Sequence, residues 1–268
     1  MFIYFKNENS DMDRYKVNCV QDNKVFLITD CYKRLCKIFE TLKTKKGNIV
    51  HIVGAPGIGK STNIFQAIPE TELSVYNVKF SLKSGDETSK EVFNRIFDGL
   101  ANDLGLSSRK DIYKKLSEFD AVLIADSFHD LHNLNSEKIG FSQWTDKAGL
   151  RSFYFYFLCI IEYFKNRNHF KEINLVLQTA WKIYILGKKY DIFTDFGFFS
   201  KIIIRVLKIF FVVEEISYSK KETIEIVRMH IEDADTENIK QYIQKYGCKP
   251  RFICNALEKF RRCQKLGG

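Results

Sequence analysis

The chain has 268 residues, a formal net charge of +9 and a sequence pI of about 9.0, with 45% hydrophobic and 28% charged residues. This composition excludes an intrinsically disordered chain and allows one large domain, or one domain with a small companion. The basic excess favours an acidic partner such as nucleic acid, although a lysine-rich solvated surface accounts for it equally well.

The cysteines indicate the redox compartment of the protein, and the apolar segments bear on whether it crosses a membrane. The seven cysteines include no C-x-x-C pair, and the chain does not open on a signal peptide. Free thiols in an intracellular compartment, nucleus or cytoplasm, are therefore expected rather than disulfides or a zinc site. The apolar segments 153–161 and 202–213 are too short or too interrupted by charge for a membrane helix, which needs ~20 apolar residues. No membrane partner is expected.

The first half of the chain alternates between helical and extended patterns. The apolar residues of segment 1–27 follow no regular helical or strand spacing, so this segment is assigned to an N-terminal arm. Asp30 is the predicted N-cap of a helix that ends near 43–47. Pro69 stops the helix that follows the first strand. The other predicted elements are strand 48–53, helix 62–68, strand 75–82, a helix capped by Ser89, a short helix around 112–119 and strand 121–126.

The second half continues the alternation and then becomes helical. The predicted elements are a long aromatic helix 143–168, strand 173–177, helix 201–208, strand 210–216, a helix capped by Ser219 with Glu222, helix 235–246 and a helix from Pro250 to about 265. This pattern predicts an α/β fold with helices on both faces of a parallel five-stranded sheet, plus a small α-helical domain. The predicted domains are 1–27, 28–217 and 218–268.

Residues 54–62 carry the strongest functional signal. They match the phosphate-binding pattern G-x-x-x-x-G-K-[ST] and lie between a strand-like and a helix-like segment. Glycines let backbone N–H groups turn toward an anion, and the following helix adds the positive end of its dipole. A glycine-rich structural turn is the alternative. The predicted nucleotide-binding residues are Gly54, Ala55, Pro56, Gly57, Ile58, Gly59, Lys60, Ser61 and Thr62.

The expected ligand is ATP with Mg²⁺. Lys60 would reach the β- and γ-phosphates, and the Ser61 hydroxyl would bind Mg²⁺. Asp126 ends the apolar segment 121–125, so we expect it to help hold Mg²⁺, directly or through water. A turn or helix-capping aspartate is the alternative.

At this point the chain resembles the AAA+ ATPases, most closely the origin-recognition and cell-division-control type of replication initiator, and the related STAND-type and archaeal ATPases. Residues 126–131, D-S-F-H-D-L, resemble the Asp-Glu-Phe-Asp-x-Leu segment of that family. Residues 30–42 resemble its first helix, 175–179 its sensor 1 strand, and 246–251 the Gly-x-x-Pro-Arg turn of its lid. The likeness covers roughly residues 28–265.

The resemblance implies a P-loop NTPase αβα core, a sheet order of five-one-four-three-two, and a helical lid with ATP between lid and core. Arg251 would be the sensor 2 arginine, and Gln178 or Thr179 the sensor 1 residue. Arg205 would be an arginine finger that enters a neighbouring subunit. Alternatively, Arg251 is a surface arginine beside the proline that starts a helix. Gln178 or Thr179 is then an ordinary polar residue at a strand end, and Arg205 a solvent-facing arginine.

One departure affects the expected activity. The family places a glutamate, the general base, directly after the Mg²⁺ aspartate, and here that position is Ser127. Asp130 could substitute only with altered geometry. The sequence therefore predicts tight ATP and Mg²⁺ binding with slow turnover, and it leaves the classification as an enzyme uncertain. The chain also ends where the initiators continue into a winged-helix domain.

Three functions remain open. The first is an origin-recognition-like subunit that acts in DNA replication with like subunits, and its basic residues 249–265 would meet DNA without reading bases. The second is a STAND-type regulatory switch. The third is a structural subunit that binds ATP without hydrolysing it. A solvated helix face is the alternative for the basic residues.

Overall fold

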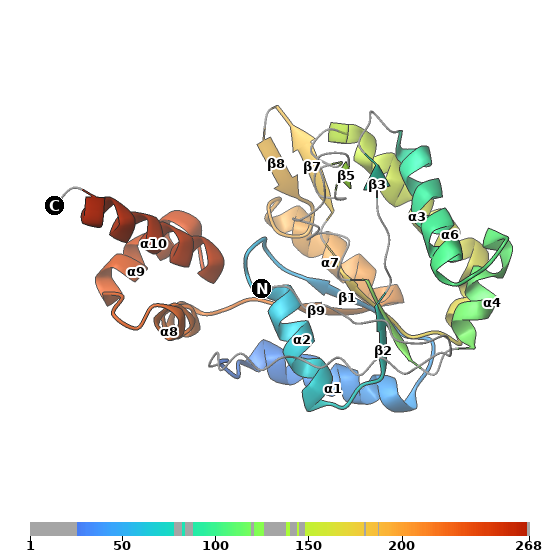
Figure 1. Cartoon of the computed structure of the whole chain (residues 1–268), viewed down its shortest axis with the longest axis horizontal. Helices are drawn as coiled ribbons and strands as arrows, with labels where there is room; N and C mark the ends of the chain where they lie inside the picture. Colours follow the sequence, from blue (N-terminus) through green and yellow to red (C-terminus); the bar gives the residue numbers. More distant parts are fainter. Residues whose placement is uncertain are drawn as a thin grey trace.

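The computed structural model describes residues 26–77, 82–83, 88–118, 121–125, 138–139, 144, 148–179, 181–186 and 188–266. A five-stranded sheet runs through it with the order β2-β4-β6-β1-β9, and all its neighbouring strands are parallel (Figure 1). This order confirms the predicted five-one-four-three-two arrangement. The strands are β1 (Ile49–Val53), β2 (Val75–Asn77), β4 (Val122–Ala125), β6 (Leu175–Gln178) and β9 (Val212–Glu215).

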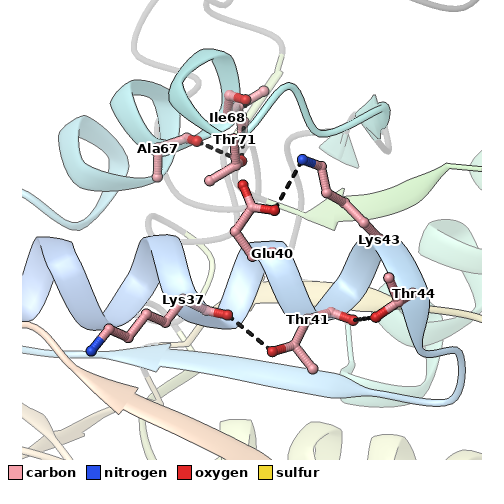
Figure 2. Close-up of polar contacts among 8 residues, drawn as sticks. All are labelled: Lys37, Glu40, Thr41, Lys43, Thr44, Ala67, Ile68 and Thr71. Atoms are coloured by element: carbon pink, nitrogen blue, oxygen red, sulfur yellow. Dashed lines mark hydrogen bonds and ion pairs between the residues drawn. The ribbon is translucent and has the colours of Figure 1, made fainter.

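Two helices cover one face of the sheet. They are α1 (Asp30–Thr44) and α2 (Lys60–Glu70), and they lie side by side (Figure 2). Leu35 and Phe39 of α1 pack with Ile64 of α2 over Val50 and Ile52 of β1. Because β-strand side chains alternate between faces, these two β1 residues belong to one layer of the core.

The ends of these helices follow from local chemistry. The N-cap of α1 is Thr29 rather than the predicted Asp30, because the extended backbone of Thr29 lets its hydroxyl accept from the N–H of Tyr32. Pro69 lies in the last turn of α2, as predicted. The Thr71 hydroxyl closes that end by donating to the carbonyl oxygens of Ala67 and Ile68 (Figure 2).

The opposite face of the sheet carries four helices. They are α3 (Ser89–Asp103), α4 (Ile112–Ser117), α6 (Ser152–Phe170) and α7 (Phe198–Phe210), with the short 3-10 helices η1 (Arg109–Asp111) and η2 (Gly149–Arg151). Ile112 of α4 packs against Leu123 of β4, and Ile204 of α7 packs against Val53 and Val213. The sheet is therefore the middle of three layers, as the predicted αβα fold requires.

The predicted bounds of one helix and one strand were wrong. The helix predicted over 143–168 does not run without interruption: Gly149 has φ +58°, which no α-helix contains, and α6 begins only at Ser152. The strand predicted over 75–82 does not form one element either. β2 ends at Asn77, and Leu82 belongs to β3 (Leu82–Lys83), which pairs antiparallel with β5 (Lys138–Ile139).

A β-hairpin between β6 and α7 was not predicted at all. It consists of β7 (Lys182–Ile185) and β8 (Lys188–Asp191), paired antiparallel. The turn between them includes Leu186, with φ +48°. Alternation in the segment K-I-Y-I-L-G-K-K-Y-D is the signal that would have indicated it.

The last three helices form a unit with its own apolar cluster, to one side of the sheet in Figure 1. They are α8 (Lys220–His230), α9 (Thr236–Tyr246) and α10 (Pro250–Leu266). The predicted capping box of Ser219 and Glu222 is confirmed at the start of α8, and Asp235 caps α9. We call this unit the helical lid. Residues 216–219 link it to β9.

Candidate functional site

The phosphate-loop sequence lies between β1 and α2, as its pattern predicted. Gly54, Gly57 and Gly59 have φ values of +154°, +76° and +102°, conformations that L side chains rarely adopt. Gly59 is the N-cap of α2 and has no side-chain capping bond. The first turn of a helix leaves N–H groups without intrahelical partners, so this loop can offer backbone donors to an anion.

The loop lies beneath the linker and the lid. A Cβ added to Gly54 would be 2.6 Å from the carbonyl oxygen of Ile216 in the linker. A Cβ added to Gly57 would be 3.2 Å from the ring of Phe252 in α10. The missing side chains therefore let segments far apart in the sequence approach the loop backbone.

Lys60 is almost completely buried, with 6% of its surface exposed. Its Nζ donates to the carbonyl oxygen of Gly54 at 2.7 Å and to that of Ala55 at 3.4 Å. The loop thus holds the ammonium group against its own backbone. Phosphate oxygens would compete with these carbonyl oxygens for the same donor, since an ionised acceptor makes the stronger hydrogen bond.

The structure separates the two candidates for the sensor 1 position. The Ser61 hydroxyl donates to Oε1 of Gln178 at 2.6 Å, which brings the predicted Mg²⁺ ligand and Gln178 together. Thr179 instead is buried on the other side of the strand end, where its Oγ1 lies 2.8 Å from Nδ1 of His51. Only Gln178 is therefore positioned beside the phosphate loop.

His51 supports the loop from within the sheet. It is a buried residue of β1, and its ring also meets Phe211 edge-on at 4.9 Å between centroids. Burial lowers the pKa of His51 to about 4, so the ring is neutral near pH 7. This residue is part of the core on the strand that carries the loop.

The predicted Mg²⁺ aspartate, Asp126, lies outside the described residues, as do Ser127 and Asp130. The strand that precedes them is described: β4 ends at Ala125, which pairs with Leu177 of β6. The carboxyl ends of β4, β6 and β1 therefore meet at the same edge of the sheet, where the phosphate loop begins.

The two predicted arginines lie in different places. The backbone N–H of Arg251, in the first turn of α10, donates to the carbonyl oxygen of Gly57 at 3.3 Å, and its side chain is exposed. The lid therefore contacts the phosphate loop at Arg251. Arg205 is exposed on α7.

Asn63 and Tyr218 form a second link between loop and lid that the sequence did not reveal. Nδ2 of the fully buried Asn63 donates to the carbonyl oxygen of Gly59 (2.8 Å) and to the Tyr218 hydroxyl (2.7 Å). Oδ1 of Asn63 is buried and has no hydrogen-bond partner among the described residues. Burial raises the pKa of Tyr218 to about 12. The signal available in the sequence was Asn63 itself, a polar residue at an inward-facing position of α2.

Two further features bear on the predicted cofactor and on membranes. Within the described residues, no three His, Cys, Asp or Glu side chains gather into a metal-binding group. In the same part of the chain, none of the helices combines the length and apolar character of a bilayer span.

No protein-family model matches the chain, and no curated protein matches its sequence. Among solved structures, it is similar to a crystal structure of a DNA replication initiation factor, with a TM-score of 0.45 and 12% sequence identity. The alignment covers 88% of this chain and 62% of that one, so the chain spans less than two thirds of that protein's length. A similarity of this size does not transfer a function.

Proposed function

We propose that the chain binds ATP with Mg²⁺ and uses it to hold the helical lid against the phosphate loop. The observation that carries the proposal is the buried Lys60 ammonium group, bonded to Gly54 at the N-terminus of α2. Lys60 is the first residue of α2, so its ammonium group lies beside helix N–H groups that have no intrahelical partner and can donate to the same anion. The positive φ values of Gly54, Gly57 and Gly59 suit a loop that turns its backbone N–H groups toward phosphates.

Each residue has a defined part in this proposal. Lys60 moves from the loop carbonyls to the phosphates, and the α2 N-terminus donates its free N–H groups to them. Ser61, oriented by Gln178, and Asp126 are the residues that would hold Mg²⁺, which neutralises phosphate charge when bound. Arg251 adds a cation from the lid, so occupancy of the site favours the docked lid.

Turnover is proposed to be slow. Ser127 occupies the position at which a carboxylate would take a proton from water, and a hydroxyl is not a base at neutral pH. Binding would then act mainly as a structural clamp between lid and core.

Replacing Lys60 tests the proposal directly. Binding of a fluorescent ATP analogue with Mg²⁺ should weaken by about a hundredfold or more in Lys60→Ala, because a charge-assisted contact to phosphate is lost. Lys43→Ala, on the outer surface of α1, is the matched control and should bind like the parent chain. Circular dichroism confirms folding. Equal affinity in Lys60→Ala would refute the proposal.

A second set of variants tests the Mg²⁺ site and the slow turnover. Ser61→Ala and Asp126→Ala should each remove the gain in affinity that Mg²⁺ provides, while binding without Mg²⁺ changes little. Ser127→Glu should raise the rate of phosphate release. If it leaves the rate unchanged although ATP still binds, the missing carboxylate does not limit turnover.

A role in DNA transactions, through assembly with like subunits, is the second candidate. The +9 net charge supports contact with DNA. The exposed position of Arg205 is compatible with a part in a neighbouring subunit's site. Sedimentation with and without ATP tests assembly, and a chain that remains monomeric in both would favour a regulatory switch or a structural subunit.

A further inference from the structure

The helix α6 exposes a continuous apolar stripe to solvent. Its members recur at helical spacing along the side that faces away from the sheet. Phe157 and Phe164 are 54% and 53% exposed. The stripe consists of Phe153, Phe157, Ile160 and Phe164. Single exposed apolar residues are common, but a stripe of this length on a soluble domain marks an interaction surface.

The helix α7 exposes a second stripe. Ile204 holds α7 against the sheet, and the opposite side of the helix is apolar as well. Ile209 is 74% exposed and Phe210 57% exposed. The stripe consists of Ile202, Val206, Ile209 and Phe210.

Aromatic contacts join the two stripes at the C-terminal ends of their helices. The ring of Phe164 lies 5.3 Å from that of Tyr163, which lies 5.0 Å from Phe211. Phe211 in turn is 6.3 Å from Phe210. Both helices cover the same face of the sheet, and these ring contacts link the ends of their stripes. We call the two stripes together the α6–α7 apolar face.

The charged side chains that α7 contributes beside this face are all basic. They are Lys201, Arg205 and Lys208, all exposed, and the helix contains no carboxylate. The single carboxylate of α6, Glu162, accepts from the Tyr113 hydroxyl at 3.0 Å, so it is engaged toward α4. Lys208 has a carboxylate of β9 nearby, which leaves Lys201 and Arg205 as the cations that a partner with negative charge would meet.

We propose that the α6–α7 apolar face is a docking surface for an acidic amphipathic helix of a partner protein. Apolar stripes on two helices that meet at one end suit a third helix, whose carboxylates would then face Lys201 and Arg205. A second copy docked through the same face would instead place these cations against each other. Branched aliphatic side chains do not stack on bases, and they interrupt the phenylalanines of both stripes, so the face is not a continuous stacking platform for single-stranded nucleic acid.

The test uses the full chain and a fluorescein-labelled synthetic helix of about five turns, with leucine and phenylalanine on one side and glutamate on the other. Anisotropy should show saturable binding. Ile209→Ser and Arg205→Glu should each weaken it by about tenfold or more, one through lost burial and the other through charge reversal. Leu186→Ser is the matched control, because Leu186 is 97% exposed on the β7–β8 turn. It should bind like the parent chain.

Several results would overturn the proposal. Equal binding of a peptide with lysine in place of glutamate would show unspecific apolar contact, and no binding of the acidic peptide would remove the docking site. Ile209-dependent dimers in sedimentation would assign the face to a second copy. Ile209-dependent binding to phosphatidylglycerol vesicles, without peptide binding, would assign it to a membrane surface. This proposal does not depend on nucleotide binding.

Discussion

At the scale of single residues, the end of β6 shows how one step along a strand separates a site residue from a core residue. Gln178 reaches Ser61 beside the phosphate loop, and Thr179 reaches His51 in the core. Neighbouring strand residues point to opposite faces, so only one of two adjacent polar side chains can serve the site. His51 then remains as a buried titratable group directly behind the loop.

His51 should make the folded state sensitive to acid. Its folded-state pKa of about 4 is below the ordinary value of 6.5, so the unfolded chain binds the proton first. Its contribution to stability is complete above about pH 6.5 and is lost as the pH falls toward 4. The loss amounts to about 3 kcal/mol.

Urea unfolding at about pH 7 and pH 4 measures this effect. His51→Asn, which keeps a polar atom near Nδ1, should lose about 3 kcal/mol less than the parent chain over this range. His230→Asn, at an exposed position on α8, should behave like the parent. Equal pH dependence in all three chains would contradict the assignment.

At the scale of elements, the linker between β9 and α8 connects the lid to the phosphate loop. The N–H of Ile216 donates to the carbonyl oxygen of Val53 at 2.9 Å, which continues the sheet into the linker. The Tyr218 hydroxyl then accepts a hydrogen bond from Nδ2 of Asn63, which also donates to the carbonyl oxygen of Gly59. A movement of the loop on nucleotide binding would therefore be transmitted to the lid through the linker.

Removing the Tyr218 hydroxyl should loosen the lid. A hydrogen bond of this kind contributes about 1 kcal/mol, so hydrogen exchange in α8 and α9 should be about fivefold faster in Tyr218→Phe. Tyr242→Phe in α9 is the matched control, since no hydrogen bond of its hydroxyl is present among the described residues. If both variants exchange alike, the linker does not hold the lid.

At the scale of the whole molecule, the excess of basic charge remains to be explained. The chain carries 42 lysines and arginines against 33 acidic residues. The proposed docking face on α6 and α7 would use some of this charge, and α10 carries another basic segment. The N-terminus of α10 lies at the loop over 54–62, where the backbone N–H of Arg251 donates to Gly57.

If α10 contacts DNA, affinity for an unrelated duplex should fall steeply with salt. Each phosphate contact contributes about 0.9 to the slope of log affinity against log salt concentration, so Lys259→Ala should lower that slope by about 1. Lys43→Ala on α1 should leave the slope unchanged. Weak or salt-independent binding would remove the DNA-binding hypothesis and favour a regulatory or structural role.

The sequence by itself determined the parts of this protein that depend on local order along the chain. Short apolar segments identified all five parallel strands, because strands buried on both faces of a parallel sheet are apolar throughout, and helical spacing identified helices between them. The order of the strands followed from the resemblance to AAA+ ATPases rather than from the pattern. The loop over 54–62 was identified because phosphate binding would require glycines, a lysine and a hydroxyl at fixed spacing.

Only the tertiary structure decided which distant residues meet. The choice between Gln178 and Thr179, the link from Asn63 to Tyr218 and the contact of Arg251 with Gly57 each join segments far apart in the chain. The exposure of the apolar stripes of α6 and α7 was not visible in the sequence either, since periodicity alone does not show whether a second layer covers a helix. Strand register and the docking of the lid bring these residues together, and neither is encoded by a local pattern.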